Sequence, residues 1–557
     1  MAWRADTPPK RTRFSDTPSF AYSDGTVFVH QYGVVEARDP ASGALRWRVE
    51  DGPDAFGRLV VGAEAVVHRS DDTVRGYAPG DGNRRWSFAA DAPVTLHPTG
   101  DRTCAYVDAD DPVLVGLGGA SGERWRVPVP GTVTEVLGRR GDTLYAAVAD
   151  GPVVAVDTAA GSVEARIGDG TEYAVLVGDT VVVATLDGHV AGYRAATGER
   201  RWERESGARP WTTDGALVLD GGTALRRLDP ATGNTVWRHD HADGRGHRVV
   251  AADDGALLAV RDGRLAEFGT DGRRRWVAPP LPGYFFDASF ADGTLFVQGD
   301  GVTAAIDRSD GSLSWLFRLA SGRREAEPFP FAVGPERVYA GDGERVVAIA
   351  RDGPPAPAAG TPTPDTDEAV TFDATASSFD GAARYGWLVD SAPRRTDEFE
   401  ATGRDFDRAF GEAGPHRVAL AMVDADAPSA RRGPTMVSFV GIEARAPSGT
   451  RSATPTPTPD VTTRVADGTP DATSTRTAGA ATPTDGPDAT ATPTGSDTPP
   501  SATETGSPTG SATDTRSGTG TDEAPTAAPG QPGFGVAAFV AAGALGLART
   551  VRRFGGR

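Results

Sequence analysis

Cysteine and lysine are almost absent from this chain of 557 residues. Cys104 is the only cysteine, so the chain cannot form an intrachain disulfide, a cysteine-rich zinc site or a C-x-x-C-H haem attachment. Cys104 lies in an apolar run and is expected to be a small, buried core residue. Lys10 is the only lysine among 57 basic residues, and the formal net charge is −19. A chain this acidic has no basic stripe to neutralise phosphates, which argues against nucleic acid as a partner.

Several sequence motifs are also missing. The chain has no glycine-rich phosphate loop, no G-x-S-x-G elbow and no H-E-x-x-H pair, and these are the motifs that would indicate common enzyme classes. It has no N-x-[ST] acceptor, so N-glycosylation is not expected. The excess of negative charge, which keeps a protein hydrated in concentrated salt, resembles that of haloarchaeal proteins. A GC-rich genome would also favour arginine over lysine.

Tryptophan recurs at a regular spacing of about 39 residues, with one interval of 77 that contains a missing member at Ala165. Self-similarity at about 40 residues is typical of repeat arrays and propellers. Short apolar runs bounded by Gly and Asp turns predict antiparallel strands joined by tight hairpins. The seven tryptophans of this structural repeat are Trp47, Trp86, Trp125, Trp202, Trp237, Trp276 and Trp315.

The repeat has the fullest form A-x-D-x3-G-x3-W, at Ala37, Asp39, Gly43 and Trp47. This pattern resembles the PQQ-like, quinoprotein-type β-propeller repeat over residues 18–353. The resemblance implies an all-β fold with eight blades, closed by a partial ninth copy over Arg337–Asp352 together with N-terminal strands. We expect each indole to pack blades together rather than to stack on a cofactor.

Two groups of side chains are candidates for metal binding. His239, His241 and His247 lie in a polar loop and are weak candidates for zinc or copper ligands. The acidic runs 108–111 and 424–426 make Ca²⁺ possible, although a chain this acidic contains such runs by chance. We otherwise expect no cofactor and solvated histidines.

Beyond the repeats, the composition changes in steps. Residues 354–367 are rich in proline and predict an extended spacer that does not pack. Residues 368–445 regain apolar alternation and predict a small β-sandwich. Their F-D-A-T-A-S-S-F-D-G run and the later G-x-H-x-V-x-L resemble a PKD-type domain. The chain departs from that family where Trp387 is followed by Leu-Val-Asp-Ser-Ala, and an unrelated sandwich remains an alternative.

The C-terminal part predicts a stalk and an anchor. Residues 446–530 consist almost entirely of Thr, Ser, Pro, Ala, Gly and Asp, which predicts a disordered stalk. In the tail, 531–557, an apolar helix over Phe534–Ala548 is followed by arginines. Pro532, Gly533 and Phe534 before that short transmembrane helix resemble the PGF-CTERM sorting signal of archaeal surface proteins. The resemblance implies an archaeosortase-type enzyme as a partner, removal of the tail and attachment to membrane lipid. The alternative is a permanent tail anchor.

The N-terminal segment, 1–17, is polar and lacks the apolar core of a secretion signal. We therefore expect the true start of the protein to lie upstream, and tail insertion after synthesis is the rival explanation. The predicted function is a non-catalytic binding or assembly scaffold at the cell surface that contacts envelope proteins or glycans. The alternative is a quinoprotein dehydrogenase that uses PQQ and Ca²⁺, an enzyme type that is longer and often carries a disulfide between adjacent cysteines.

Overall fold

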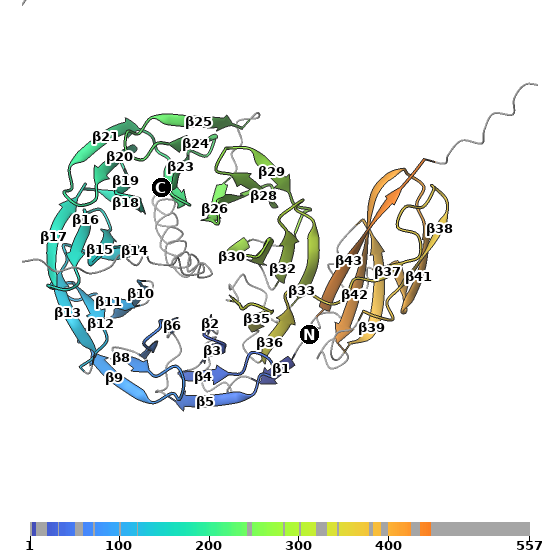
Figure 1. The fold of residues 1–557 in the computed structure, drawn as a ribbon, viewed down its shortest axis with the longest axis horizontal. Helices are drawn as coiled ribbons and strands as arrows, with labels where there is room; N and C mark the ends of the chain where they lie inside the picture. The colour runs from blue at the N-terminus through green and yellow to red at the C-terminus, as the bar shows by residue number, and fades with distance from the viewer. Residues whose placement is uncertain are drawn as a thin grey trace, which may run out of the picture. The chain divides into compact units, whose positions relative to one another are not determined.

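The computed structural model describes most of the chain up to residue 446 (Figure 1). The described ranges are 3–6, 19–31, 33–50, 59–70, 73–99, 102–119, 121–241, 248–281, 285–299, 302–318, 331–341, 345–377, 382–390, 399–424 and 435–446. Within these ranges every regular element is a β-strand, which confirms the all-β prediction.

Nine four-stranded units make up a ring (Figure 1). In eight of them the strands follow one another along the chain from the inner to the outer strand, and we number these blades 1 to 8. Blade 1 contains β2 (Ser19–Ser23), β3 (Thr26–Gln31), β4 (Val34–Arg38) and β5 (Leu45–Glu50), and blade 2 contains β6 (Leu59–Val61), β7 (Val66–Ser70), β8 (Thr73–Tyr77) and β9 (Arg84–Ala89). Blade 3 contains β10 (Val94–Pro98), β11 (Thr103–Val107), β12 (Val113–Leu117) and β13 (Glu123–Pro128), and blade 4 contains β14 (Val133–Arg140), β15 (Thr143–Val148), β16 (Val153–Asp157) and β17 (Ser162–Ile167).

The second half of the ring repeats this arrangement. Blade 5 contains β18 (Thr171–Val177), β19 (Thr180–Thr185), β20 (His189–Arg194) and β21 (Arg200–Glu205), and blade 6 contains β22 (Arg209–Thr213), β23 (Ala216–Asp220), β24 (Ala224–Leu228) and β25 (Thr235–Asp240). Blade 7 contains β26 (Arg248–Asp253), β27 (Ala256–Arg261), β28 (Arg264–Gly269) and β29 (Arg274–Val277), and blade 8 contains β30 (Phe285–Ala291), β31 (Thr294–Gly299), β32 (Val302–Asp307) and β33 (Leu313–Arg318).

Blade 9 joins the two ends of the propeller sequence. It contains β34 (Phe331–Val333), β35 (Arg337–Gly341) and β36 (Arg345–Ala350), and its outer strand is β1 (Trp3–Asp6). Strand β1 pairs antiparallel with β36 in a register that places Trp3 opposite Ala348. The participation of N-terminal residues in closure is as expected. The strand nevertheless lies inside 1–17, which was predicted to lie outside the propeller.

The ring therefore contains nine blades in the described part of the chain, and the prediction of eight is wrong. The partial ninth copy does not merely support blade 1, because β1 gives it a fourth strand of its own. Nine hydrophobic clusters follow the nine blade junctions. The cluster that contains Trp3, Val27 and Tyr339 joins blade 9 to blade 1 and closes the ring.

The burial pattern of each blade follows from its two neighbours. The middle strands β3 and β4 are buried at every position, since both of their faces meet another blade. The outer strand β5 alternates, and its inward side chain is Trp47. Hairpins such as Asp24-Gly25, with φ of 45° and 66°, have the two positive φ values of a type I′ turn.

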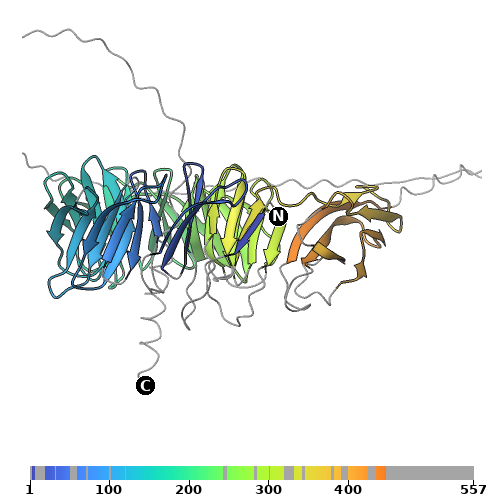
Figure 2. The ribbon, with the colours of Figure 1, turned by 90° about the horizontal axis from the view of Figure 1, so that it is seen from below.

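Edge-on, the strands run between the two faces of the ring (Figure 2). We call the face that carries the Asp24-Gly25 and Asp39–Gly43 turns the motif face. The innermost strands begin at the opposite face, because all of them end at the motif-face hairpins.

A second group of strands follows the ring. These strands are β37 (Ala358–Ala359), β38 (Ala369–Asp373), β39 (Ala382–Val389), β40 (Ala401–Thr402), β41 (Asp405–Ala409), β42 (Gly414–Asp424) and β43 (Thr435–Ala444). Strands β37, β38 and β41 form one sheet. The other sheet continues from blade 8, because β43 pairs antiparallel with the outer strand β33 and places Ser438 opposite Trp315. The two sheets enclose Phe372, Trp387 and Phe406, an arrangement that fits the predicted sandwich.

The proline-rich segment 354–367 packs against this sandwich, so the prediction of an unpacked spacer is wrong. Its carbonyl groups accept main-chain hydrogen bonds, from Glu443 to Pro362 at 3.1 Å and from Arg445 to Pro364 at 2.8 Å. Proline lacks an N–H group but keeps its carbonyl as an acceptor, and these carbonyls allow the segment to lie along β43.

The predicted stalk and the tail lie outside the described residues. The described part of the chain contains no helix that is long and apolar enough to cross a membrane.

Candidate functional site

The Asp and Gly of the repeat motif build a turn on the motif face. The Asp39 carboxylate accepts hydrogen bonds from the main-chain N–H of Ala41 and of Ser42, at 3.0 and 2.9 Å. The Gly43 N–H donates to the Asp39 carbonyl at 2.8 Å. Arg46, which donates to the same carboxylate, and the Ser42 amide hold the pKa of Asp39 well below its usual range. Equivalent turns begin at Asp157, Asp229 and Asp307.

At six junctions the turn in this position receives the indole of the preceding blade, whereas Gly161 of the Asp157 turn meets only the Cβ and Cα of Trp125. The Trp47 Nε1–H donates to the Pro79 carbonyl of blade 2 at 2.9 Å. A Cβ atom at Gly82 would lie 2.8 Å from the Trp47 ring, so only glycine allows this approach. Both contacts recur for Trp3, Trp47, Trp202, Trp237, Trp276 and Trp315. Trp86 and Trp125 also lie at blade junctions but show neither of these two contacts.

Two positions of this series depart from the sequence pattern. Trp3 occupies the indole position at the junction of blades 9 and 1, where its Nε1–H donates to the Pro40 carbonyl at 2.9 Å. Sequence reasoning missed Trp3 because it precedes Trp47 by 44 residues, which does not fit the period. Ala165 occupies the indole position on β17, as the spacing predicted, and it pairs with Ala155 of β16.

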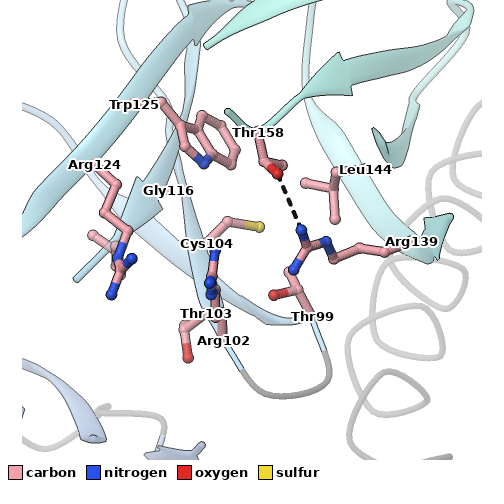
Figure 3. A pocket seen from close by; sticks show the side chains of 11 residues that line it. Thr99, Arg102, Thr103, Cys104, Gly116, Arg124, Trp125, Arg139, Leu144 and Thr158 are labelled. Atoms are coloured by element: carbon pink, nitrogen blue, oxygen red, sulfur yellow. Dashed lines mark hydrogen bonds between the residues drawn. The ribbon is translucent and has the colours of Figure 1, made fainter. Parts of the chain in front are cut away.

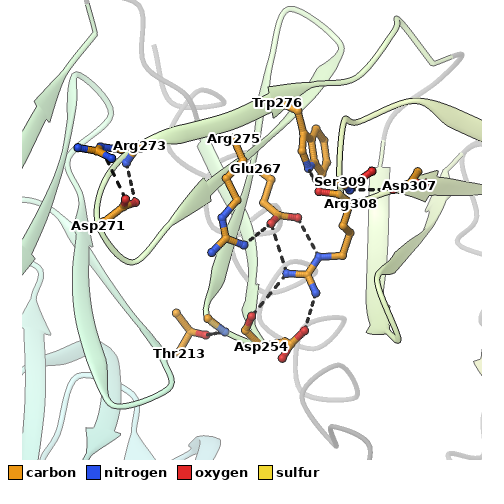
Figure 4. A network of polar contacts seen from close by, with 11 residues as sticks. Thr213, Asp254, Glu267, Asp271, Arg273, Arg275, Trp276, Asp307, Arg308 and Ser309 are labelled. Carbon is orange, nitrogen blue, oxygen red and sulfur yellow. Dashed lines mark hydrogen bonds and ion pairs between the residues drawn. The ribbon is translucent and has the colours of Figure 1, made fainter.

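A buried ionic network joins blades 7 and 8 on the same face (Figure 4). Glu267 is 1% exposed and accepts from Arg275 at 2.7 Å and from the Arg308 Nε at 3.0 Å. Arg308 also pairs with Asp254, and its carbonyl accepts the Trp276 Nε1–H. Burial opposes the charge of Arg308, but the bonds to Glu267 and Asp254 prevail and raise its pKa. A buried carboxylate held by two guanidinium groups thus links blades 7 and 8.

A small pocket lies between blades 3 and 4 (Figure 3). Its cavity volume is only about 20 Å³, and it is lined by Trp125, Arg139 and Thr158 among others. The Arg139 Nη2 donates to the Thr158 hydroxyl at 3.1 Å. Cys104 also lines the pocket and is 1% exposed, and burial raises the pKa of its thiol to about 12. This pocket is smaller than most ligand sites, and its thiol is an unreactive core group, as predicted.

The predicted histidine site is only partly described. His239 and His241 lie at the end of blade 6 with their ring centroids 5.6 Å apart, in an edge-on arrangement. His247 lies outside the described residues. Burial, followed by the proximity of His239, lowers the pKa of His241. Across the described ranges, no three His, Cys, Asp or Glu side chains are grouped to hold a metal ion.

Of the two acidic runs, 108–111 is fully described, whereas 424–426 and the sorting motif are not. Asp108 accepts the hydroxyl of Tyr106 at 2.9 Å, and this hydrogen bond gives the carboxylate a local structural role. The side chain of Asp424, residue 426 and the motif Pro532, Gly533 and Phe534 lie outside the described residues.

A group of aromatic and charged side chains lies on β14, β18 and β22, the innermost strands of blades 4, 5 and 6. The guanidinium carbon of Arg209 lies 4.6 Å from the ring centroid of Tyr173 and 4.4 Å from that of Trp211. Burial lowers the pKa of Arg209, whereas Tyr173 and Glu135 oppose this shift. Burial raises the pKa of Glu135, and Arg209 opposes that shift. We call Glu135, Tyr173, Arg209 and Trp211 the inner-strand group.

Sequence reasoning missed the inner-strand group because its members come from three repeats and form no local motif. They share one signal, which is that each lies within the first three residues of an innermost strand. An alignment of the repeats would place all four residues near one face of the ring, the face opposite the motif face. Aromatic rings stacked on a guanidinium form a rigid surface that presents both apolar area and charge.

Sequence and structure comparisons place the ring among known proteins. The sequence family described as outer membrane protein assembly factor BamB matches residues 1–103, 70–223 and 220–369. The outer membrane protein assembly factor BamB of Burkholderia pseudomallei (strain K96243) is 26% identical over 282 residues, which cover 46% of this chain and 66% of that protein. The serine/threonine-protein kinase AfsK of Streptomyces griseus is 30% identical over 186 residues, which cover 29% of this chain and 23% of the kinase.

Similar folds occur among solved structures. The crystal structure of BamB from Moraxella catarrhalis has a TM-score of 0.39 and 16% identity, and the match covers 52% of this chain and 95% of that one. This chain spans less than a quarter of the kinase and about two thirds of the Burkholderia protein. The family match covers more than half of the chain, and this chain therefore belongs to the PQQ-like β-propeller repeat family described as outer membrane protein assembly factor BamB.

Proposed function

We propose that this protein is a non-catalytic binding or assembly scaffold, anchored at the cell surface, that contacts envelope proteins or glycans. The ring is rigid because each junction is filled by a hydrophobic cluster. The described hairpins within the blades are short, so they offer fixed surfaces. Rigid presentation of side chains lowers the entropic cost of binding a partner.

The inner-strand group is the observation that carries this proposal. Arginine and the large aromatic residues dominate the energetics of protein interfaces, and aromatic faces also stack on sugar rings. Arg209 is held between Tyr173 and Trp211 before any partner arrives. The group is therefore already ordered for contact with a protein or a glycan.

The alternative is a quinoprotein dehydrogenase, which the family resemblance implied. Such an enzyme would bind PQQ above a Ca²⁺ ion, and Ca²⁺ takes six to eight oxygen ligands. The described residues do not fit this pair, because they bring no three carboxylate, imidazole or thiol groups together. Cys104 is the only cysteine and cannot form a disulfide with a neighbour.

A capture experiment tests the scaffold. Immobilised protein, exposed to a cell-envelope extract in molar salt, should retain specific proteins or glycans. Arg209→Ala should abolish this retention, whereas Arg273→Ala, which removes the same charge from an exposed turn of blade 7, should not. Equal retention by both variants would show that the inner-strand group is not the contact site. Addition of PQQ and Ca²⁺ tests the alternative, and a saturable cofactor absorbance band would favour the enzyme.

Surface attachment is the second part of the proposal. The Thr- and Pro-rich stalk, the Pro532-Gly533-Phe534 triplet, the short apolar run and the final arginines are arranged as in archaeal sorting signals. An apolar helix of 15 residues spans about 22 Å, less than the hydrocarbon core of about 30 Å. Such a segment suits a transient membrane stage before transfer to lipid better than a permanent span.

A further inference from the structure

We propose that the pocket between blades 3 and 4 binds one halide ion, such as chloride, which holds these two blades together on the motif face (Figure 3). The pocket takes part neither in the proposed contact with a partner nor in surface attachment. This inference therefore stands or fails independently of the proposed function.

The pocket lies where one indole stops short of the next blade. At the sister junctions a Cβ built on the turn glycine would meet the indole ring, as at Gly233, where the ring of Trp202 is 2.5 Å away. A Cβ built at Gly161 would meet only the Cβ and Cα of Trp125, at 3.0 and 3.8 Å. The Trp125 ring covers Gly116 of its own blade but leaves Gly161 uncovered. Space therefore remains between this ring and the turn of blade 4.

Thr158 marks the same place from the side of blade 4. It directly follows the Asp of its turn, as Pro230 does, and the Pro230 carbonyl accepts the Trp202 Nε1–H at 2.9 Å. Both Thr158 and Trp125 line the pocket. The pocket thus occupies the part of the junction where a sister junction holds an indole and a carbonyl in contact.

The polar groups around this pocket are of the kind that binds an anion. Arg102, Arg124 and Arg139 line it with guanidinium groups, and no carboxylate of the described residues lines it. The Nε atoms of Arg102 and Arg139 are buried, so part of each charge is withdrawn from water and attracts an anion more strongly. Guanidinium and indole groups donate hydrogen bonds but cannot accept them. Such donors favour an ion that only accepts over a water molecule, which must also donate.

Two of these arginines also pair with carboxylates outside the pocket. The Arg124 Nη2 lies 2.5 Å from Glu64, and the Arg139 Nη2 lies 3.7 Å from Asp142, whose side chain is 80% exposed. An ion pair at 3.7 Å with an exposed carboxylate is weak, so Asp142 does not take the place of an anion in the pocket. The Arg139 Nη2 also donates to the Thr158 hydroxyl, and this bond holds the guanidinium group at the junction.

The size of the pocket selects the class of anion. Its cavity volume is about 20 Å³, and a cavity of about 10–15 Å³ holds one water-sized particle. One monatomic ion therefore fits, whereas sulfate and phosphate, with four oxygen atoms each, do not. A halide combines this size with the single negative charge that the guanidinium groups attract.

Thermal unfolding of the full chain at constant ionic strength tests this inference. Sodium chloride is exchanged stepwise for sodium gluconate, whose anion is too large for the pocket, while screening of the surface charge stays the same. The melting temperature should rise with chloride along a saturating curve. Arg139→Gln should weaken the apparent chloride affinity at least tenfold, whereas Arg140→Gln, which removes the same charge from the exposed neighbouring position, should leave it unchanged. Equal weakening in both variants, or a melting temperature indifferent to the exchange, would overturn the proposal.

Diffraction from the native chain keeps the test valid if Arg139→Gln fails to fold. Crystals grown in sodium bromide should show an anomalous bromide peak within hydrogen-bond distance of the Arg139 guanidinium group. A water molecule at that place would refute the assignment to an anion. Sulfate that displaces the bromide at equal concentration would refute the assignment to a monatomic ion.

Discussion

Replacement of Trp315 by alanine is the most direct test of how the ring is held together. Trp315 is fully buried, and its Nε1–H donates to the Arg351 carbonyl at 2.7 Å. It contacts Gly353 of the blade 9 turn and belongs to a cluster that also contains Phe372 and Trp387 of the sandwich. One side chain thus stabilises two blades and the second domain.

The expected cost follows from this burial. A tryptophan buries about 150–250 Å², which at roughly 25 cal/mol per Å² corresponds to about 4–6 kcal/mol of transfer free energy. Large-to-small replacements of buried aromatic residues cost about 3–5 kcal/mol. We therefore expect Trp315→Ala to lower the free energy of unfolding by about 3–5 kcal/mol, part of it from the unpaired Arg351 carbonyl.

Trp237 provides a matched control. It makes the same two contacts with the next blade but remains partly exposed, so Trp237→Ala should cost at least about 1 kcal/mol less. Trp315→Phe should cost less than Trp315→Ala but more than Trp237→Ala, because it keeps ring area but loses the N–H donor. Urea unfolding in molar salt, followed by circular dichroism, measures all three. If Trp315→Ala costs no more than Trp237→Ala, the assignment of Trp315 to a doubly covered core is wrong.

Four further outcomes are expected. Molar salt should raise the melting temperature above that in dilute buffer, since the Debye length falls to about 3 Å and the self-repulsion of the −19 chain is screened; a melting temperature indifferent to salt would contradict this. Replacement of Pro532, Gly533 and Phe534 should leave the precursor uncleaved in the membrane, whereas recovery of a native C-terminus with its arginines by mass spectrometry would identify a permanent anchor. Hydrogen bonds to Asp390 and to the Glu412 carbonyl raise the pKa of His416 in the folded protein. Its contribution to the free energy of unfolding is therefore complete below the unfolded pKa of about 6.5 and is lost as the pH rises through the folded pKa. His416→Gln should flatten this part of the plot of stability against pH, and an unchanged plot would show that the histidine does not contribute. Cys104 should react with a thiol reagent at pH 8 only after unfolding, because its pKa is about 12; rapid labelling of the folded chain would refute its burial.

The repeat made the blades predictable because each motif residue has a geometric task. The Asp forms the turn, the Gly admits the indole and the Trp fills the junction, and this geometry fixes their spacing. The spacing even located Ala165. The number of blades was not predictable in the same way, because Trp3 pairs with Ala348 at the far end of the propeller sequence and follows no local period.

Tertiary contacts explain the remaining differences. The composition of 354–367 correctly predicts a chain without long strands, but its packing depends on main-chain donors of Glu443 and Arg445, about 80 residues away. The inner-strand group could not be predicted from a motif, since Arg209 meets Tyr173 only when blades 5 and 6 are adjacent. The histidine prediction was based on proximity in sequence, and the structure describes only two of its three members.

The pairing of β1 with β36 has a consequence for synthesis of the protein. About 345 residues separate Trp3 from Ala348, so β1 must wait for the last strand of the ring. At about 5–20 residues per second this delay is roughly 17–70 s. Blades 1 to 8 can form in order from local hairpins during that time, whereas the final junction requires a distant encounter and sets the slow step. Until then the nascent chain is an open arc with two exposed ends, and this arc is the state that chaperones would meet.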